Sequence, residues 1–210
     1  MGVEWRDQGG SMNLFKSVFV CFGLSLLGTF AMAGSANLDI GQWGLSYNVS
    51  TMPNMVMGFE TGFGISNGKI NLNKANGAWS GTFGMTRVSA SSPKVNGDKT
   101  EITVTSFPGD TSVFTIDTSK SFKVTALMRS VQYFSDLKDA GKSLEVSTEY
   151  GTVALTRKTD TEYDGQAISG IDTALATLKV SGDLTPTVLA SQDPGLFILL
   201  YILPYSLPNQ

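Results

Sequence analysis

Residues 69–89, KINLNKANGAWSGTFGMTRVS, carry the pattern that decides the fold. Asn76-Gly77 divides this stretch, and the pair favours the tight turn of a β-hairpin because both residues tolerate positive φ values. After the turn, Trp79, Phe83 and Met85 fall on one face of a strand predicted over 78–89, with Gly81 between them. The stretch therefore predicts two neighbouring antiparallel strands.

Short alternating runs and turn signals continue on both sides, from residue 41 to residue 117. Trp43, Leu45, Tyr47 and Val49 alternate with small or polar residues, which is typical of a half-buried strand. Further turns are predicted at Asn67-Gly68 and Asn96-Gly97, and further strands over 59–65, 100–107 and 113–116. Glycines inside the strands fit sharp curvature or closure of a sheet on itself. We therefore expect an all-β fold, an antiparallel β-sandwich or a small barrel.

The spacing of apolar residues changes after residue 122. Helical intervals separate Leu127, Val131, Phe134 and Leu137, which predicts a short amphipathic helix ended by Gly141. Strands over 144–148 and 151–158 and a turn at Asp164-Gly165 should follow. A second helix is predicted over 170–179, capped by Ser169, with an apolar stripe of Ile171, Ala174, Leu175 and Leu178. The β domain should thus carry one or two short helices.

The segment from Ser169 to Leu178 reads SGIDTALATL. With the amphipathic piece and hydrophobic hairpin before it, this segment resembles the C-terminal half of invasion-associated locus B type periplasmic proteins, which end in S-G-x-x-x-A-L-x-x-L. The resemblance covers residues 137–178, which is 42 of 210 residues, and it is a packing pattern rather than a chemical motif. It implies a periplasmic β-sandwich, although this chain lacks the cysteines common in that family.

An uninterrupted apolar run, LFILLYIL, extends from Leu196 to Leu203. It is far shorter than the ~20 residues that a membrane-spanning helix needs. We predict a central strand that is buried on both faces. Two alternatives stay open: contact of this run with a membrane or a partner, and a GPI-type tail attached at Ser181 or Gly182.

The N-terminal part predicts export. Residues 12–33, MNLFKSVFVCFGLSLLGTFAMA, combine Lys16, an apolar run and a final Ala31-Met32-Ala33, which is the pattern of a cleaved signal peptide. Residues 1–11 are polar, and we interpret them as a leader that is non-native or wrongly assigned to the chain. We expect one β-rich domain over 34–210, in the periplasm or outside the cell.

Composition excludes several classes of function. Lys and Arg number 15 against 18 Asp and Glu, and a net charge of −3 argues against a nucleic-acid partner. Histidine is absent and the single cysteine, Cys21, lies in the predicted signal, which excludes Ser-His-Asp and Cys-His catalysis and the usual zinc sites. Nothing in the spacing pairs the carboxylates of Glu60, Glu101, Glu145 and Glu149. We expect no enzyme and no cofactor.

Two stretches contain candidate metal ligands. Met52, Met55 and Met57 place three thioethers within six residues, and soft thioethers select Cu(I). The competing interpretation is that methionine fills irregular gaps in a core. Asp160, Glu162 and Asp164, followed by Gly165, match the opening of a calcium loop, but the twelfth position holds Ile171 instead of glutamate. The competing interpretation there is a solvated hairpin turn.

Aromatic residues give the candidate ligand-binding surface. Trp43, Tyr47, Trp79 and Phe83 could share one apolar face, as core of a sandwich or as the lining of a barrel. We therefore predict an exported, non-enzymatic binding or cell-envelope protein whose partner is a small molecule or another envelope protein. Two alternatives stay open: a small eight-stranded outer-membrane β-barrel, and a methionine-based Cu(I)-binding periplasmic protein.

Overall fold

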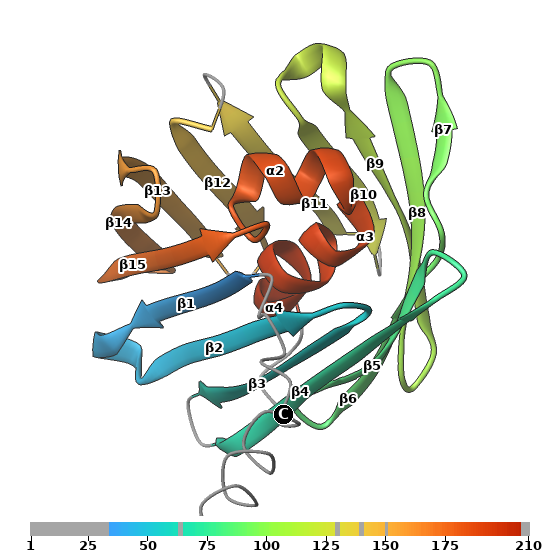
Figure 1. The fold of residues 1–210 in the computed structure, drawn as a ribbon. Helices are drawn as coiled ribbons and strands as arrows, with labels where there is room; N and C mark the ends of the chain where they lie inside the picture. Colours follow the sequence, from blue (N-terminus) through green and yellow to red (C-terminus); the bar gives the residue numbers. More distant parts are fainter. Residues whose placement is uncertain (1–33, 63–64, 129–130, 139–140, 150, 207–210) are drawn as a thin grey trace, which may run out of the picture. The chain divides into compact units, whose positions relative to one another are not determined.

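The computed structural model describes residues 34–62, 65–128, 131–138, 141–149 and 151–206. The predicted leader and signal peptide lie outside these residues. In the described part, fifteen strands form one antiparallel sheet (Figure 1). They are β1 (Gly34–Ile40), β2 (Leu45–Met52), β3 (Met55–Gly62), β4 (Ile65–Ala75), β5 (Ala78–Phe83), β6 (Thr86–Ala90), β7 (Lys94–Asn96), β8 (Lys99–Ser106), β9 (Asp110–Asp117), β10 (Lys123–Met128), β11 (Val131–Lys138), β12 (Ser143–Thr148), β13 (Gly151–Thr159), β14 (Glu162–Ser169) and β15 (Asp172–Gly182).

The sheet closes into a barrel. β1 pairs with β15 and β6 pairs with β8, so that fourteen strands form a ring and β7 lies outside it, hydrogen-bonded to β8. Ser91, which follows β6, continues the pairing with β8. Its amide donates to the Thr103 carbonyl, and its hydroxyl accepts from the Thr103 amide. An all-β fold with short helices is confirmed, but the sandwich is wrong and so is the number of eight strands for a barrel.

Close approach between strands explains several glycines. A Cβ atom at Gly165 would lie 1.8 Å from the Ala154 carbonyl oxygen, and one at Gly58 would lie 2.0 Å from that of Asn48. Asp164-Gly165 lies in the middle of β14 and forms no turn, contrary to our expectation. Asn67-Gly68 likewise lies within β4, whereas Asn76-Gly77 forms the predicted turn between β4 and β5.

The C-terminal segment fills the barrel. It forms α2 (Pro186–Gln192), α3 (Pro194–Phe197), a π-helical turn η3 (Ile198–Ile202) and α4 (Leu203–Ser206), which lie inside the ring of strands in Figure 1. Every residue from Pro194 to Leu203 is buried. Three buried tyrosine hydroxyls donate to backbone carbonyls: Tyr47 to Leu200 (2.8 Å), Tyr201 to Leu184 (2.7 Å) and Tyr163 to Gly141 (3.3 Å). The segment is thus an internal plug that completes the core.

Three secondary-structure predictions are wrong. The run from Leu196 to Leu203 is helical rather than a central strand, and its burial leaves none of it at the surface for the membrane contact considered above. Leu127 and Leu137 lie on the paired strands β10 and β11, the first 65% exposed and the second buried, so they share no helical stripe. Residues 172–182 form β15, where Ala174 and Leu178 point inward while Leu175 is exposed. None of the helices in the described ranges has the length and hydropathy needed to cross a bilayer.

Candidate functional site

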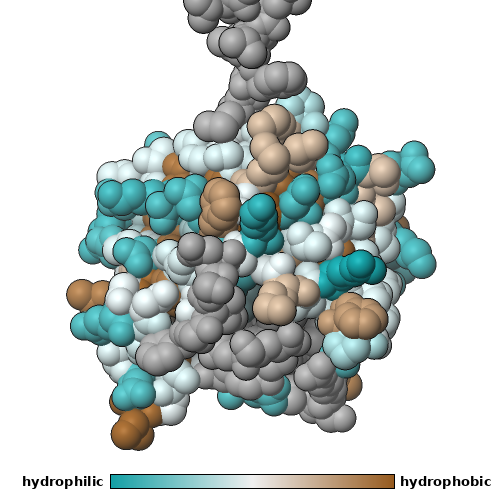
Figure 2. All heavy atoms as spheres, turned by 90° about the horizontal axis from the view of Figure 1, so that it is seen from below, coloured by the Kyte–Doolittle hydropathy of each residue, from teal (hydrophilic) through white to brown (hydrophobic). Residues whose placement is uncertain are grey.

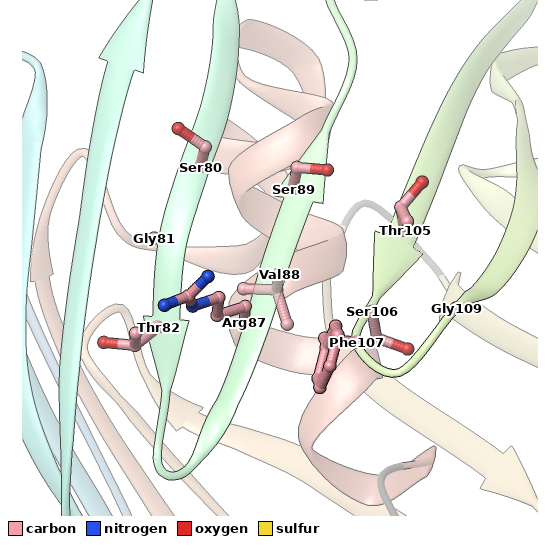
Figure 3. Close-up of a pocket in the computed structure, with 10 residues that line it drawn as sticks. All are labelled: Ser80, Gly81, Thr82, Arg87, Val88, Ser89, Thr105, Ser106, Phe107 and Gly109. Carbon is pink, nitrogen blue, oxygen red and sulfur yellow. The ribbon is translucent and has the colours of Figure 1, made fainter.

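A groove on the outer face of the barrel is the candidate site. Its volume is about 480 Å³, and it lies where β5, β6 and the β8–β9 turn meet (Figure 3). The lining consists mainly of small, polar side chains with one cation and one ring, namely Ser80, Gly81, Thr82, Arg87, Val88, Ser89, Thr105, Ser106, Phe107 and Gly109. Because strand side chains alternate between faces, Trp79 and Phe83 point into the barrel while Ser80 and Thr82 face the groove.

Strand register arranges the lining in two rows. Ser80, Ser89 and Thr105 lie opposite one another across β5, β6 and β8, which makes a row of hydroxyl groups. In the second row Thr82 lies opposite Arg87, and the Phe107 amide donates to the Arg87 carbonyl (2.9 Å). Side chains directly opposite each other on neighbouring strands are about 4.5–5.5 Å apart at Cβ. One ligand of modest size could therefore contact both rows.

Among the residues that the structure describes, Arg87 is the only charged one that lines the groove. Its guanidinium makes no ion pair with any described residue, although arginines and lysines elsewhere do. The Phe107 ring is 67% exposed and stands at the margin of the groove near Arg87 (Figure 3). The site therefore offers a free cation, four hydroxyl groups that face outward or are partly exposed, and one aromatic face.

Three of the four predicted ligand-binding aromatics lie on the inner side of the barrel wall, and the fourth, Trp43, lies in the 3-10 turn between β1 and β2. Tyr47, Trp79 and Phe83 are buried, and the rings of Tyr47 and Phe83 meet edge to face with centroids 6.3 Å apart. The Trp79 indole N–H donates to the Asp193 carboxylate (2.9 Å), and Trp43 is partly buried against the same core. The structure thus brings Tyr47 and Phe83 into contact and places Trp79 on the same inner face of β5 as Phe83, but the C-terminal plug covers this surface.

The metal candidates have different outcomes. Met52, Met55 and Met57 all lie on the outer face of the β2–β3 hairpin, as expected for Met55 and Met57 from their spacing. The three acidic candidates are not gathered: Asp160 is fully exposed near Arg157 (3.9 Å), and Glu162 pairs with Lys179 (3.4 Å). In the described part of the chain, no group of three His, Cys, Asp or Glu residues is placed to hold a metal ion.

Sequence reasoning missed the groove because it followed the apolar phase of each strand. The signal that could have found the groove is the polar phase of the same stretch, where Ser80, Thr82, Arg87 and Ser89 alternate with the apolar residues. Thr105 and Phe107 join these residues only because the ring closes between β6 and β8. The sequence alone does not contain that pairing in any local pattern.

Comparison with known proteins adds no relative. No protein-family model matches the chain, and neither the curated proteins nor the solved structures give a match. The site must therefore be interpreted from its own chemistry.

Proposed function

We propose that the protein is an exported, non-enzymatic binding protein of the cell envelope whose outer groove holds an acidic, hydroxyl-rich ligand such as an acidic saccharide. The observation that carries this proposal is Arg87, which lies unpaired among the described residues and beside outward-facing hydroxyl groups. Export is supported by the signal-peptide pattern over 12–33.

The lining chemistry favours an anion. A guanidinium binds a carboxylate or phosphate through two parallel hydrogen bonds. In the described part of the chain, no carboxylate lines the groove to compete with the ligand or repel it. Serine and threonine hydroxyls both donate and accept, so the row formed by Ser80, Ser89 and Thr105 suits a ligand with many hydroxyl groups. The exposed Phe107 ring offers an apolar face at the margin.

The same lining favours binding over catalysis. General acid–base catalysis needs a group that gains or loses a proton near neutral pH within hydrogen-bond reach of the reacting atoms. Arginine stays protonated in proteins, and the other lining residues are hydroxyl, glycine or apolar residues. Glu101 and Thr103, two outward positions of β8 next to the groove, are polar as well, and the face of the molecule in Figure 2 carries its apolar residues scattered among polar ones.

A glycan array with matched pairs tests this proposal. Each uronic-acid oligosaccharide on the array is accompanied by its carboxyl-reduced, neutral counterpart. We expect retention on acidic glycans only, and a loss of roughly tenfold or more in affinity for Arg87→Ala, because a hydrogen bond to a charged group contributes about 1.5–3 kcal/mol. Arg157→Ala, which removes an arginine of β13 that does not line the groove, should bind like the unaltered protein. Equal binding by Arg87→Ala, or no retained acidic glycan, would contradict the proposal.

A further inference from the structure

The three methionines of the β2–β3 hairpin form a cluster on the outside of the barrel. Met52 lies directly opposite Met55, across the two-residue turn made by Pro53 and Asn54, and Asn54 has φ +61°. Met57 follows Met55 by two positions on the same face of β3. Thr51, which precedes Met52, and Val56, which lies between Met55 and Met57, are opposite each other and buried on the inner face. Met55 therefore lies between the other two methionines on one surface.

Thioether convergence is within reach of this backbone geometry. Residues opposite each other on paired strands have Cβ atoms about 4.5–5.5 Å apart, and residues two apart on one strand are separated by about 6.6 Å. Methionine is unbranched with three rotatable bonds, so sulfur atoms at such spacings can meet over Met55. Proline fixes one φ angle of the turn, which holds Met52 and Met55 in register.

The outward placement removes the usual explanation for methionine. Methionine in a core fills gaps between packed side chains, but Met57 is 41% exposed and Met52 and Met55 are half-buried on the outer face. An exposed methionine is also a site of oxidation. Packing of the interior therefore accounts for none of the three.

The surroundings of the cluster are neutral. Register places Ser50 and Asn71 on either side of Met57, and Asn73 beside Met55. The Asn73 amide donates to the Asn71 side-chain oxygen (3.4 Å). The first charged side chain on this face among the register partners of β3 is Lys69, opposite Phe59. Without a carboxylate, this surface offers little to hard cations such as Ca²⁺ and Mg²⁺, which take oxygen ligands.

We propose that Met52, Met55 and Met57 form a Cu(I)-binding site on the outer face of the β2–β3 hairpin. Soft thioether ligands select Cu(I) over the harder divalent ions. Binding is a coordination step in which copper keeps its oxidation state and no proton is released. The site is separate from the Arg87 groove, so the two proposals can succeed or fail independently.

Competition against a chromophoric Cu(I) chelator, without oxygen, tests the site in the full chain. All proteins should carry Cys21→Ser, because Cys21 is the one thiol of the sequence and would bind Cu(I) itself. We expect the triple change of Met52, Met55 and Met57 to leucine to weaken Cu(I) binding by at least roughly tenfold relative to this background. The matched control is Met85→Leu, since Met85 is 81% exposed and lies between β5 and β6, outside the β2–β3 hairpin. Equal affinity for the background and the triple variant would overturn the proposal.

A second measurement protects the test against a variant that does not fold. Ag(I), which has the softness of Cu(I) and does not change oxidation state, is titrated into the Cys21→Ser chain labelled at the methionine methyl carbons. We expect the methyl signals of Met52, Met55 and Met57 to shift together at one equivalent, while that of Met85 stays in place. Shifts that follow exposure alone, with Met85 responding as strongly as Met57, would overturn the proposal.

Discussion

The two faces of the wall formed by β5, β6 and β8 carry different side chains, which contact the core on the inside and line a groove on the outside. On the inner face Trp79, Phe83 and Val88 belong to the buried core that also contains the C-terminal plug. On the outer face Thr82 and Arg87 line an open groove, and their neighbours in sequence belong to the inner face. Because side chains alternate along a strand, a single residue step separates the two faces. The residues of the core and the residues of the proposed binding groove therefore alternate along one stretch, and stability and the proposed binding should respond separately to substitution.

The largest expected effect comes from removing the centre of the plug. Phe197 is fully buried and its ring stacks on Tyr201 with centroids 5.6 Å apart. Phe197→Ala should lower the free energy of unfolding by about 3–5 kcal/mol, through lost burial and the cavity that remains. Urea unfolding measures this change. The matched control is Phe107→Ala on the outer face, where the change should stay within about 0.5 kcal/mol. Similar losses for the two phenylalanines would break the distinction between the faces.

A polar clasp holds the plug to the inner wall and gives the next largest effect. Asp193 pairs with Lys74, accepts from the Trp79 indole N–H (2.9 Å) and accepts from the Leu196 amide (3.2 Å), which caps α3. Asp193→Ala leaves the largely buried indole N–H without its partner, so we expect a loss of about 2–3 kcal/mol in unfolding free energy. Asp160→Ala, at an exposed ion pair, should cost less than about 1 kcal/mol. Equal effects of the two would show that the clasp does not fasten the plug.

The strands could be predicted from local sequence, but what the barrel contains could not. Alternation over Tyr47 and Val49 and the Asn76-Gly77 turn are local signals, and the structure confirms both. The run from Leu196 to Leu203 is apolar throughout, so periodicity cannot separate a strand buried on both faces from a helix buried all round. Only the closed ring supplies apolar surroundings on every side, and closure depends on pairings such as Val88 with Ser106.

The methionine cluster and Asp193 show the same difference between local and long-range signals. The placement of Met55 and Met57 on one face followed from period-two spacing, whereas their outward direction required the register of β2 and β3. Asp193 was not singled out, because its partners Lys74 and Trp79 are more than a hundred residues away in sequence. Helical spacing at 127–137 and 170–179 arose by coincidence, and pairing within the sheet prevailed over it.

A carboxylate on the inward phase of β3 allows the inner and outer faces to be compared through the pH dependence of stability. Glu60 lies opposite Tyr47, and burial raises its pKa above the ordinary value of 4.5. The folded state therefore holds the Glu60 proton more tightly than the unfolded state, so the contribution of Glu60 to stability is fully present below pH 4.5 and is lost as the pH rises through the folded pKa. Glu60→Gln should remove this fall and be the more stable protein at pH 7. Melting temperatures at pH 4 and pH 7 measure it, with Glu101→Gln on the outer face as the control. A fall that persists unchanged in Glu60→Gln would assign it to another group.

The smallest expected change in stability belongs to the groove. Arg87 is exposed and makes no ion pair with a described residue, so Arg87→Ala should alter the unfolding free energy by less than about 0.5 kcal/mol. Its effect should appear only with ligand: a uronic-acid oligosaccharide that binds the native state must raise the melting temperature of the unaltered protein and leave that of Arg87→Ala nearly unchanged. Val104→Ala, next to Thr105 on β8, should give the opposite result, a lower melting temperature without ligand and the same increase on adding it, because Val104 is buried in the core and does not line the groove. If Arg87→Ala instead destabilises the protein as much as Val104→Ala does, the guanidinium contributes to the packing of the wall, and the proposal that the groove is a binding site is contradicted.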